Sequence, residues 1–244
     1  MEAGDPKLEH EHTVEAIQKR ISHVEHSYLR DWIYGGIDGT ITTFAVVSGV
    51  AGAGLSPAIV LILGFANLVA DGFSMAASNF LGTRAEHDDY ENLRAIERRH
   101  IEIAPEGERE EVRQIYSNKG FSGDELETAV NLITANKDRW VNTMLMEEYG
   151  LPAQVRSPKK AAASTFTAFA VCGFIPLIPY LFTKRYDFLI SAVLTGVVFF
   201  IIGSLKSRWT NSSWYRSGSE TFVIGGLAAS LAYGVGVLLK GLSV

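Results

Sequence analysis

The chain of 244 residues contains a single cysteine, Cys172. One thiol excludes a disulfide framework, an iron–sulfur cluster held by one chain and a thiolate zinc finger. Basic residues are in the minority, since 22 Lys and Arg stand against 27 Asp and Glu, a formal net charge of −5. Nucleic-acid binding requires a basic surface, so we expect no nucleic-acid partner. The N-terminal residues are acidic and polar, which argues against a cleaved signal peptide.

Charge of either sign is scarce over most of the chain. Residues 1–31 and 84–160 carry 39 of the 49 charged residues, and the other 136 residues carry only ten. Such segregation is typical of a membrane protein whose water-exposed parts are separate from its apolar spans. The mild mean hydropathy of +0.12 is then an average over two different kinds of segment.

Long apolar runs account for the remaining sequence. At ~1.5 Å per residue, about 20 residues span the hydrocarbon of a bilayer as a helix. We therefore predict an all-α membrane protein with five transmembrane helices, at residues 32–55, 57–83, 161–183, 188–205 and 221–239. The predicted organisation is an amphipathic N-terminal segment (1–31), transmembrane helices 1 and 2 (32–83), a charged helical insert (84–160) and transmembrane helices 3 to 5 (161–244).

The distribution of Lys and Arg predicts the orientation of these helices. Five crossings place residues 1–31, with 4 Lys and Arg, and residues 84–160, with 12, on the same side of the membrane. The positive-inside rule then predicts a cytosolic N-terminus and a cytosolic insert. No organelle-sorting signal is evident. We expect a multi-pass protein of a bacterial inner (plasma) membrane, with a vacuolar membrane as the alternative.

The charged insert has the pattern of a folded helical domain. Its apolar residues recur at helical spacing. We predict that the second membrane helix continues to about Ile103, and that short amphipathic helices follow near 105–118, 123–135 and 138–149. Residues that typically begin or end helices agree with these limits. Pro105 can begin a helix, Gly120 can end one, and the pair Ser122 and Glu125 has the spacing of a capping box.

Proline and glycine predict local features of the membrane helices. Pro176 and Pro179 should kink or open the third one. Gly35 and Gly39 form a small-xxx-small pair that lets helices approach closely, either within one chain or across a dimer. The same two explanations apply to the glycines of the fifth helix, Gly225, Gly226, Gly234 and Gly236.

Two carboxylates fall inside predicted spans. An ionised Asp at bilayer depth costs at least ~2.5–3.5 kcal/mol, so Asp38 and Asp71 are expected to face a functional cavity. Asn67, Asp71 and Met75 follow at intervals of four residues, on one helix face. Carboxylate, amide oxygen and thioether together suit a borderline divalent ion such as Fe²⁺ or Mn²⁺. The alternative is a structural role, for example a cap on a neighbouring helix.

The insert offers a second set of potential metal ligands. Its acids and one imidazole lie on three predicted helices: Glu97 with His100, then Glu108 with Glu111, then Met144 with Glu147 and Glu148. Carboxylates and imidazole bind metals in di-iron proteins through Glu-x-x-His pairs. The alternative is that these are solvated faces of acidic helices. The N-terminal histidines His10, His12, His23 and His26 have the same two explanations, loose metal binding or an ordinary amphipathic helix.

Three motifs of the chain resemble the vacuolar iron transporter family. Residues 35–39 (GGIDG) and 42–49 (TTFAVVSG) resemble its first helix, residues 66–75 (ANLVADGFSM) its second, and residues 176–180 (PLIPY) its third. The order of five helices, with an acidic helical insert between the second and the third, is also similar. The resemblance extends from about Tyr28 to the C-terminus.

The resemblance implies a homodimer in the lipid bilayer that moves Fe²⁺, and often Mn²⁺, out of the cytosol in exchange for protons. It implies that Asp38 and Met75 line the ion path near the dimer axis, and we expect Asn67 and Asp71 to contribute to that path. It also implies that the insert collects cytosolic metal through Glu97, His100, Glu108, Glu111, Met144 and Glu148. We expect no enzymatic activity and no prosthetic group. Co²⁺ and Zn²⁺ are further candidate substrate ions.

The chain departs from the family pattern at two candidate positions. Plant members have Glu where this chain has His100 and where it has Asn67, and here the second-helix carboxylate would lie one turn later, at Asp71. Two other functions remain open: a membrane-bound di-iron enzyme of ferroxidase type, and a metal-sequestering protein without transport. The intramembrane carboxylates favour the transporter.

Overall fold

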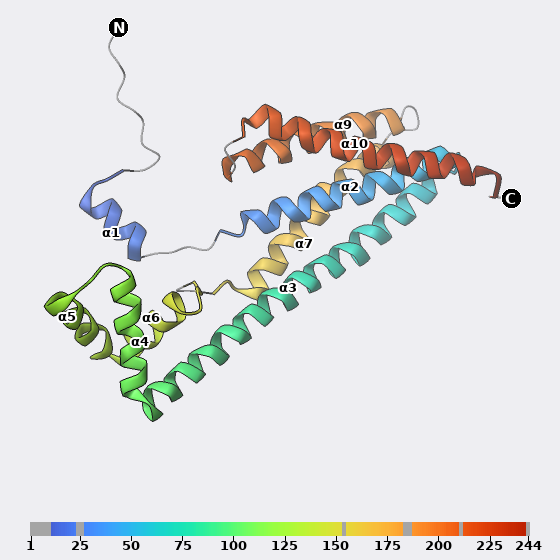
Figure 1. The fold of residues 1–244 in the computed structure, drawn as a ribbon. Coiled ribbons are helices and arrows are strands. Elements are labelled where there is room, and N and C mark those ends of the chain that lie inside the picture. The colour runs from blue at the N-terminus through green and yellow to red at the C-terminus, as the bar shows by residue number, and fades with distance from the viewer. Residues whose placement is uncertain (1–10, 23–26, 153–154, 183–186, 210–211, 243–244) are drawn as a thin grey trace, which may run out of the picture.

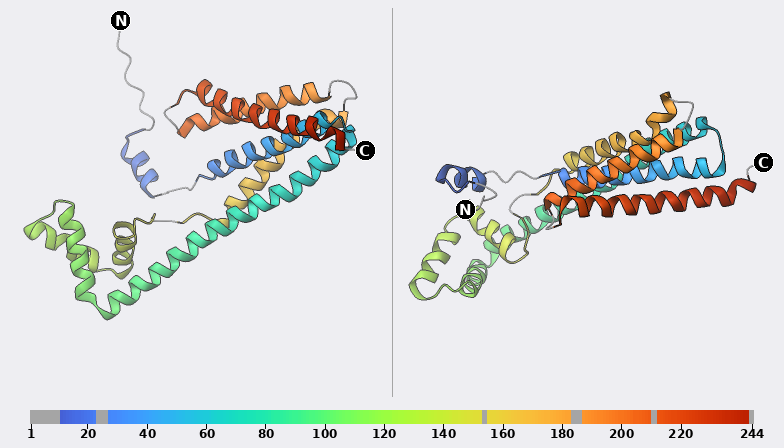
Figure 2. Two further views of the ribbon diagram at one scale, coloured as in Figure 1. Left: turned by 45° about the vertical axis from the view of Figure 1, so that its right-hand side comes forward. Right: turned by 90° about the horizontal axis from the view of Figure 1, so that it is seen from above.

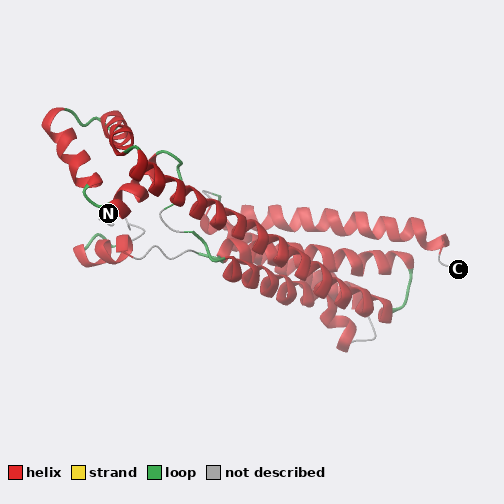
Figure 3. Ribbon diagram, turned by 90° about the horizontal axis from the view of Figure 1, so that it is seen from below, coloured by secondary structure: helices red, strands yellow, loops and turns green. Residues whose placement is uncertain are grey.

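A computed structural model describes residues 11–22, 27–152, 155–182, 187–209 and 212–242 (Figure 1). Within these residues all regular structure is helical (Figure 3). The helices are α1 (Val14–Ser22), α2 (Leu29–Ala53), α3 (Pro57–Ile103), α4 (Pro105–Asn118), α5 (Gly123–Thr134), α6 (Lys137–Glu147), α7 (Pro158–Phe174), η1 (Ile175–Leu177), α8 (Ile178–Phe182), α9 (Asp187–Lys206), η2 (Ser207–Trp209), α10 (Trp214–Leu239) and η3 (Lys240–Leu242).

Five helical segments of the described chain are long and apolar enough to cross a membrane: α2, α3, the α7–α8 unit, α9 and α10. This confirms the predicted number of spans. The main difference is at α10, which begins at Trp214, before the predicted start at Thr221. The prediction followed hydropathy, whereas a helix can continue through polar residues beyond the hydrocarbon because its hydrogen bonds are internal.

Helix α3 joins the two parts of the molecule. It contains 47 residues, which corresponds to ~70 Å at 1.5 Å per residue, more than twice the ~30 Å of a bilayer core. Its first half packs with the membrane helices, and its second half reaches the insert formed by α4, α5 and α6 (Figures 1 and 2). The predicted continuation of this helix to Ile103 is confirmed.

Close helix packing explains the glycine pair of α2. A Cβ atom at Gly35 would collide with the carbonyl oxygen of Thr165 in α7, and one at Gly39 with that of Phe169. On α10, Gly236 meets the α2 backbone in the same way. The small-xxx-small pair therefore serves packing within the chain, which was one of the two explanations.

The prolines interrupt the third span as predicted. The 3₁₀ turn η1 contains Pro176 and separates α7 from α8, which contains Pro179. Because proline has no backbone N–H, Pro176 and Pro179 remove the α-helical donors of the carbonyls of Cys172 and Ile175. Those carbonyls accept instead from the amides of Ile175 and Ile178, in the tighter 3₁₀ pattern. The hydroxyl of Ser191 in α9 also donates to the carbonyl oxygen of Pro176 at 2.7 Å.

The insert has its own apolar core, built where α4, α5 and α6 pack against the far half of α3. Gly120 adopts φ +98° just after α4, as expected of a residue that ends a helix. The predicted capping box is wrong in detail, because Ser122 is the N-cap of α5 but its side chain makes no capping hydrogen bond. The buried core residues are Tyr90, Ile101, Val112, Val130, Trp140, Val141, Met144 and Leu145.

The N-terminal segment contributes the short helix α1, near the insert (Figure 1). His12 precedes it and is exposed. The other three N-terminal histidines, His10, His23 and His26, lie outside the described residues.

Candidate metal sites

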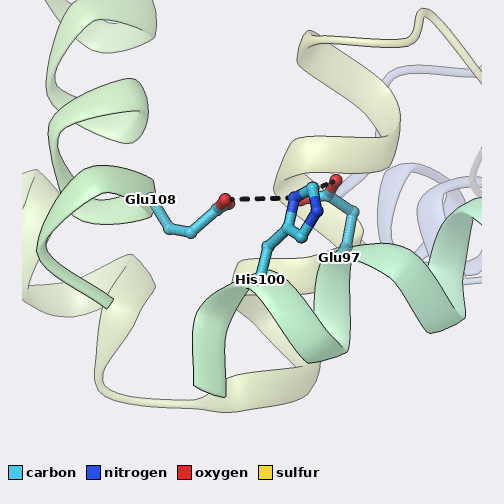
Figure 4. Close-up of side chains that lie close together, drawn as sticks. All are labelled: Glu97, His100 and Glu108. Atoms are coloured by element: carbon cyan, nitrogen blue, oxygen red, sulfur yellow. Dashed lines mark ion pairs between the residues drawn. The ribbon is translucent and has the colours of Figure 1, made fainter. Parts of the chain in front are cut away.

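Three side chains of the insert converge on one point (Figure 4). Glu97 and His100 lie one turn apart on α3, and Glu108 faces them from α4. One ligand atom from each lies within 4.8 Å of the others. The Nδ1 atom of His100 is 3.4 Å from Oε1 of Glu108 and 4.0 Å from Oε1 of Glu97. We call Glu97, His100 and Glu108 the insert cluster.

The turn between α3 and α4 creates this cluster. Ala104 adopts a non-helical conformation, and Pro105 then begins α4 as its first residue. Because the chain reverses there, the early turns of α4 lie against the last turns of α3. Glu97 is 1% exposed and Glu108 is 6% exposed, so both acids are buried among the apolar residues of the insert.

The buried carboxylates are only partly satisfied by protein donors. Oε1 of Glu97 accepts a hydrogen bond from the hydroxyl of Tyr149 at 3.0 Å. The Oε2 atoms of Glu97 and Glu108 are buried and have no hydrogen-bond partner. Leaving a buried acceptor unsatisfied costs about 1–3 kcal/mol, and more for a charged group. Two such oxygens beside an imidazole form a donor set that suits a borderline divalent cation.

Electrostatics connect two further predicted ligands to the cluster. Burial, followed by the charges of Glu111 and Glu97, raises the pKa of Glu108 to about 7. Burial and the charges of Glu97 and Glu111 also raise the pKa of Glu148. Glu111 and Glu148 therefore lie close enough to the insert cluster for their charges to act on it. The predicted ligand Met144, in contrast, is fully buried in the apolar core.

A second acidic site lies among the membrane helices. A cavity of about 580 Å³ is bounded by α2, α3 and Thr165 of α7. We call it the aspartate cavity because Asp31, Asp38 and Asp71 line it, together with Arg30, Tyr34, Ser74, Met75, Ser78 and Asn79. Asp38 and Asp71, from different helices, thus share one open space with the thioether of Met75. The fourth residue predicted for this path, Asn67, is not among the lining residues.

Asn67 instead connects α3 to α2. Its Nδ2 atom donates to the hydroxyls of Thr42 at 3.1 Å and Thr43 at 3.3 Å. The periodicity put Asn67 on the same face as Asp71 and Met75. In the structure its side chain is partly buried, and its amide group donates to the two threonines of α2.

Sequence reasoning missed a polar network at one end of the aspartate cavity. Asp31 is 8% exposed, forms an ion pair with Arg156, and accepts a hydrogen bond from Nδ2 of Asn79 at 3.0 Å. The same amide group contacts the hydroxyl of Thr165 at 2.7 Å. The charge pattern of the sequence assigns Asp31 to the charged, water-exposed N-terminal segment. In the structure Asp31 lies in the first turn of α2 and is buried.

Comparison with known proteins gives one consistent result. The VIT family matches residues 29–237 of the chain. "Vacuolar iron transporter 1" of Arabidopsis thaliana is 36% identical over 210 residues, which cover 84% of this chain and 83% of the plant protein. "Vacuolar iron transporter" of Toxoplasma gondii is 32% identical over 231 residues, covering 90% of this chain and 76% of that protein. "Vacuolar iron transporter 1" of Eucalyptus grandis is 30% identical over 239 residues, covering 96% of this chain and 95% of that protein.

Proposed function

The chain belongs to the VIT family, and on that premise we propose that it is a transporter, not an enzyme, that exports Fe²⁺ from the cytosol in exchange for protons. The observation that carries this proposal is the aspartate cavity. Asp38 and Asp71 come from two apolar helices and line the same open space with Met75. Carboxylates at this depth are costly, so they usually face a cavity and bind a substrate ion or a proton.

Competition between metal and proton for a carboxylate couples the two fluxes. Metal binds the deprotonated form of Asp38, and a proton that arrives from the opposite side displaces it. Asp71 supplies a second carboxylate in the same cavity, and Met75 a softer ligand that favours Fe²⁺ over Mg²⁺. Each proton that moves down one pH unit supplies ~1.4 kcal/mol. Across one pH unit, one or two protons per ion can therefore support about a tenfold to a hundredfold metal gradient.

The insert serves as the metal-collecting part of the transporter. Glu97, His100 and Glu108 are the ligands that the geometry favours, with Glu111 and Glu148 adding negative charge nearby. The donor set also suits Mn²⁺, Co²⁺ and Zn²⁺. Met144, which the family resemblance gives as a further ligand, lies in the apolar core of the insert. The insert lies on the side of the molecule where α2 begins (Figure 1). Helix α3 connects the two sites, and Glu97 follows the cavity residue Asn79 by about 27 Å of continuous helix.

Orientation and assembly complete the proposal. The Lys and Arg distribution favours a cytosolic N-terminus and insert. A bacterial plasma membrane is the proposed location, with a vacuolar membrane as the alternative suggested by the names of the relatives. A homodimer is proposed from the family resemblance. It is compatible with the apolar outer faces of α3 and α10, which either lipid or a second copy can cover.

The test is metal flux in proteoliposomes under an imposed pH gradient. Wild-type protein should transport Fe²⁺ and Mn²⁺ at a rate that increases with the gradient, and Asp38→Asn should reduce this flux about 100-fold. The matched control is Asp88→Asn, the same chemical change at an exposed site on α3. Dissipating the gradient with a proton ionophore should also reduce the wild-type flux.

The other outcomes identify the rival functions. Gradient-independent flux would contradict proton coupling but leave metal transport standing. A folded wild-type protein that binds metal without flux would be a sequestering protein. Oxygen consumption on addition of Fe²⁺, lost in Glu97→Gln, would instead indicate a di-iron oxidase.

A further inference from the structure

Tyr149 occupies a position that metal binding by the insert does not by itself explain. It follows the last turn of α6, and its ring packs against the apolar core of the insert. Its hydroxyl donates to Oε1 of Glu97, which is 52 residues earlier in the sequence. The hydroxyl therefore reaches a carboxylate that belongs to the insert cluster.

The backbone around Tyr149 is fixed by the end of α6. Gly150 adopts φ +65°, and the amide of Leu151 donates to the carbonyl oxygen of Leu145 at 2.9 Å. Glycine adopts this left-handed conformation at little cost, so Gly150 turns the chain away just after Tyr149. The phenol is therefore presented to Glu97 from the turn that follows α6.

The hydrogen bond divides the Glu97 carboxylate into two unequal oxygens. Oε1 accepts from Tyr149, whereas Oε2 is buried and has no protein donor. Glu97 is 1% exposed, so water does not provide an alternative set of partners. A ring of the same shape without the hydroxyl would fill the core equally well. The hydroxyl is thus the part of Tyr149 that needs a functional explanation.

We propose that Tyr149 is a positioning residue of the insert cluster, whose hydroxyl fixes the Glu97 carboxylate with one oxygen engaged and the other free to bind a divalent cation. This inference rests on the proposed metal-collecting role of the insert. Partners that orient a ligating side chain typically contribute about 10–100-fold to metal affinity, because the ligand need not be ordered when the ion binds.

The experiment is a titration of the full-length, detergent-solubilised protein with Co²⁺, followed by visible absorption. Co²⁺ serves as the probe because it is stable in air and its absorption bands report ligand geometry. The same titration of Glu108→Gln identifies the part of the signal that belongs to the insert cluster. Tyr149→Phe should raise the dissociation constant of that part about 10-fold without changing its stoichiometry. Its Co²⁺ bands should shift, because the binding mode of Glu97 changes.

The matched control is Tyr116→Phe. Tyr116 packs against the same insert core, but its ring contacts Phe121 and Lys119 rather than Glu97. Its substitution should leave both affinity and spectrum unchanged. Thermal unfolding in the absence of metal should show a loss of stability for Tyr149→Phe but not for Tyr116→Phe, because only the former leaves Oε1 of Glu97 without its donor. Affinity and Co²⁺ spectrum are measured on the folded protein well below its unfolding temperature, which separates a loss of metal affinity from this loss of stability.

Two results would overturn the inference, and they differ in what else they affect. If Glu108→Gln removes a Co²⁺-binding component that Tyr149→Phe leaves unchanged in affinity and spectrum, Tyr149 has no positioning role, and metal collection by the insert stands. If wild-type protein has no component sensitive to Glu108→Gln, metal collection by the insert fails and the role of Tyr149 fails with it.

Discussion

The two acidic sites differ in how tightly their side chains are confined. In the insert cluster, Glu97 and Glu108 are almost fully buried, and their carboxylates lie close to an imidazole. In the aspartate cavity, Asp38 and Asp71 line an open volume of about 580 Å³. A preorganised set of ligands favours retention of an ion, whereas an open cavity with few ligands favours passage. The comparison indicates a collecting site joined by α3 to a transport path.

The largest expected effect is that of Asp38→Asn, which should impair transport and leave metal binding by the insert intact. Asp38→Asn should reduce proton-coupled Fe²⁺ flux about 100-fold, equivalent to ~2.8 kcal/mol of lost interaction. Binding of Co²⁺ by the insert should remain unchanged, because the cavity and the cluster share no residue. Both quantities can be measured on one preparation by proteoliposome flux and absorption titration. Loss of insert binding in this variant would mean that the sites are not independent.

The reciprocal variant is Glu108→Gln. Removing one buried carboxylate should weaken metal binding by the insert about 100-fold. Flux should fall at low metal concentration and approach the wild-type value at saturating metal, because the aspartate cavity is intact. Glu106→Gln, an exposed acid on the same helix, is the control. An unchanged concentration dependence of flux in Glu108→Gln would contradict a collecting role.

Acidity should distinguish the insert from an ordinary solvated carboxylate cluster. Since the pKa of Glu108 is about 7, metal must displace a proton below that pH. Insert affinity should fall up to about tenfold per pH unit between pH 7 and pH 5 and change little above pH 8. Co²⁺ titrations across this range test the prediction. A flat profile from pH 5 to 8 would show that Glu108 titrates normally.

The same shift has a consequence for stability without metal. The pKa of Glu108 is raised above its usual value of 4.5, so the folded insert retains a proton that the unfolded chain has lost. Stability of the metal-free protein should therefore decrease as pH rises from about 4.5 through 7 and then level off. Thermal unfolding at pH 5 and pH 8 measures the difference. It should disappear in Glu108→Gln, and its persistence there would assign it to another group.

The smallest expected effect concerns ion preference. Replacing imidazole by carboxylate in His100→Glu makes the insert cluster harder, so affinity for Mn²⁺ relative to Co²⁺ should rise several-fold. Competition between the two ions in the absorption titration gives this ratio directly. His87→Glu is the control, since His87 is a partly exposed histidine on the same helix and lies outside the insert cluster. Equal ratios in both variants would show that His100 does not ligate the metal.

Local pattern was sufficient for much of this architecture. The five spans, the continuation of α3 to Ile103 and the three short helices of the insert follow from runs of apolar residues, helical periodicity, proline and glycine. The pairing of Glu97 with His100 could also be predicted from the sequence, because residues three apart share a helix face. The sequence determined these features because each depends on residues within a few turns of one another.

Only the tertiary structure decided which polar groups meet. Tyr149 reaches Glu97 across 52 residues, and Arg156 reaches Asp31 across 125. Asn67 contacts the threonines of α2, and Met144 lies in the core of the insert, although helical spacing had put both on candidate metal-binding faces. Spacing defines a face of one helix but not the helix that covers it. Partners far apart in sequence are selected by packing and by the cost of leaving a buried polar group unpaired.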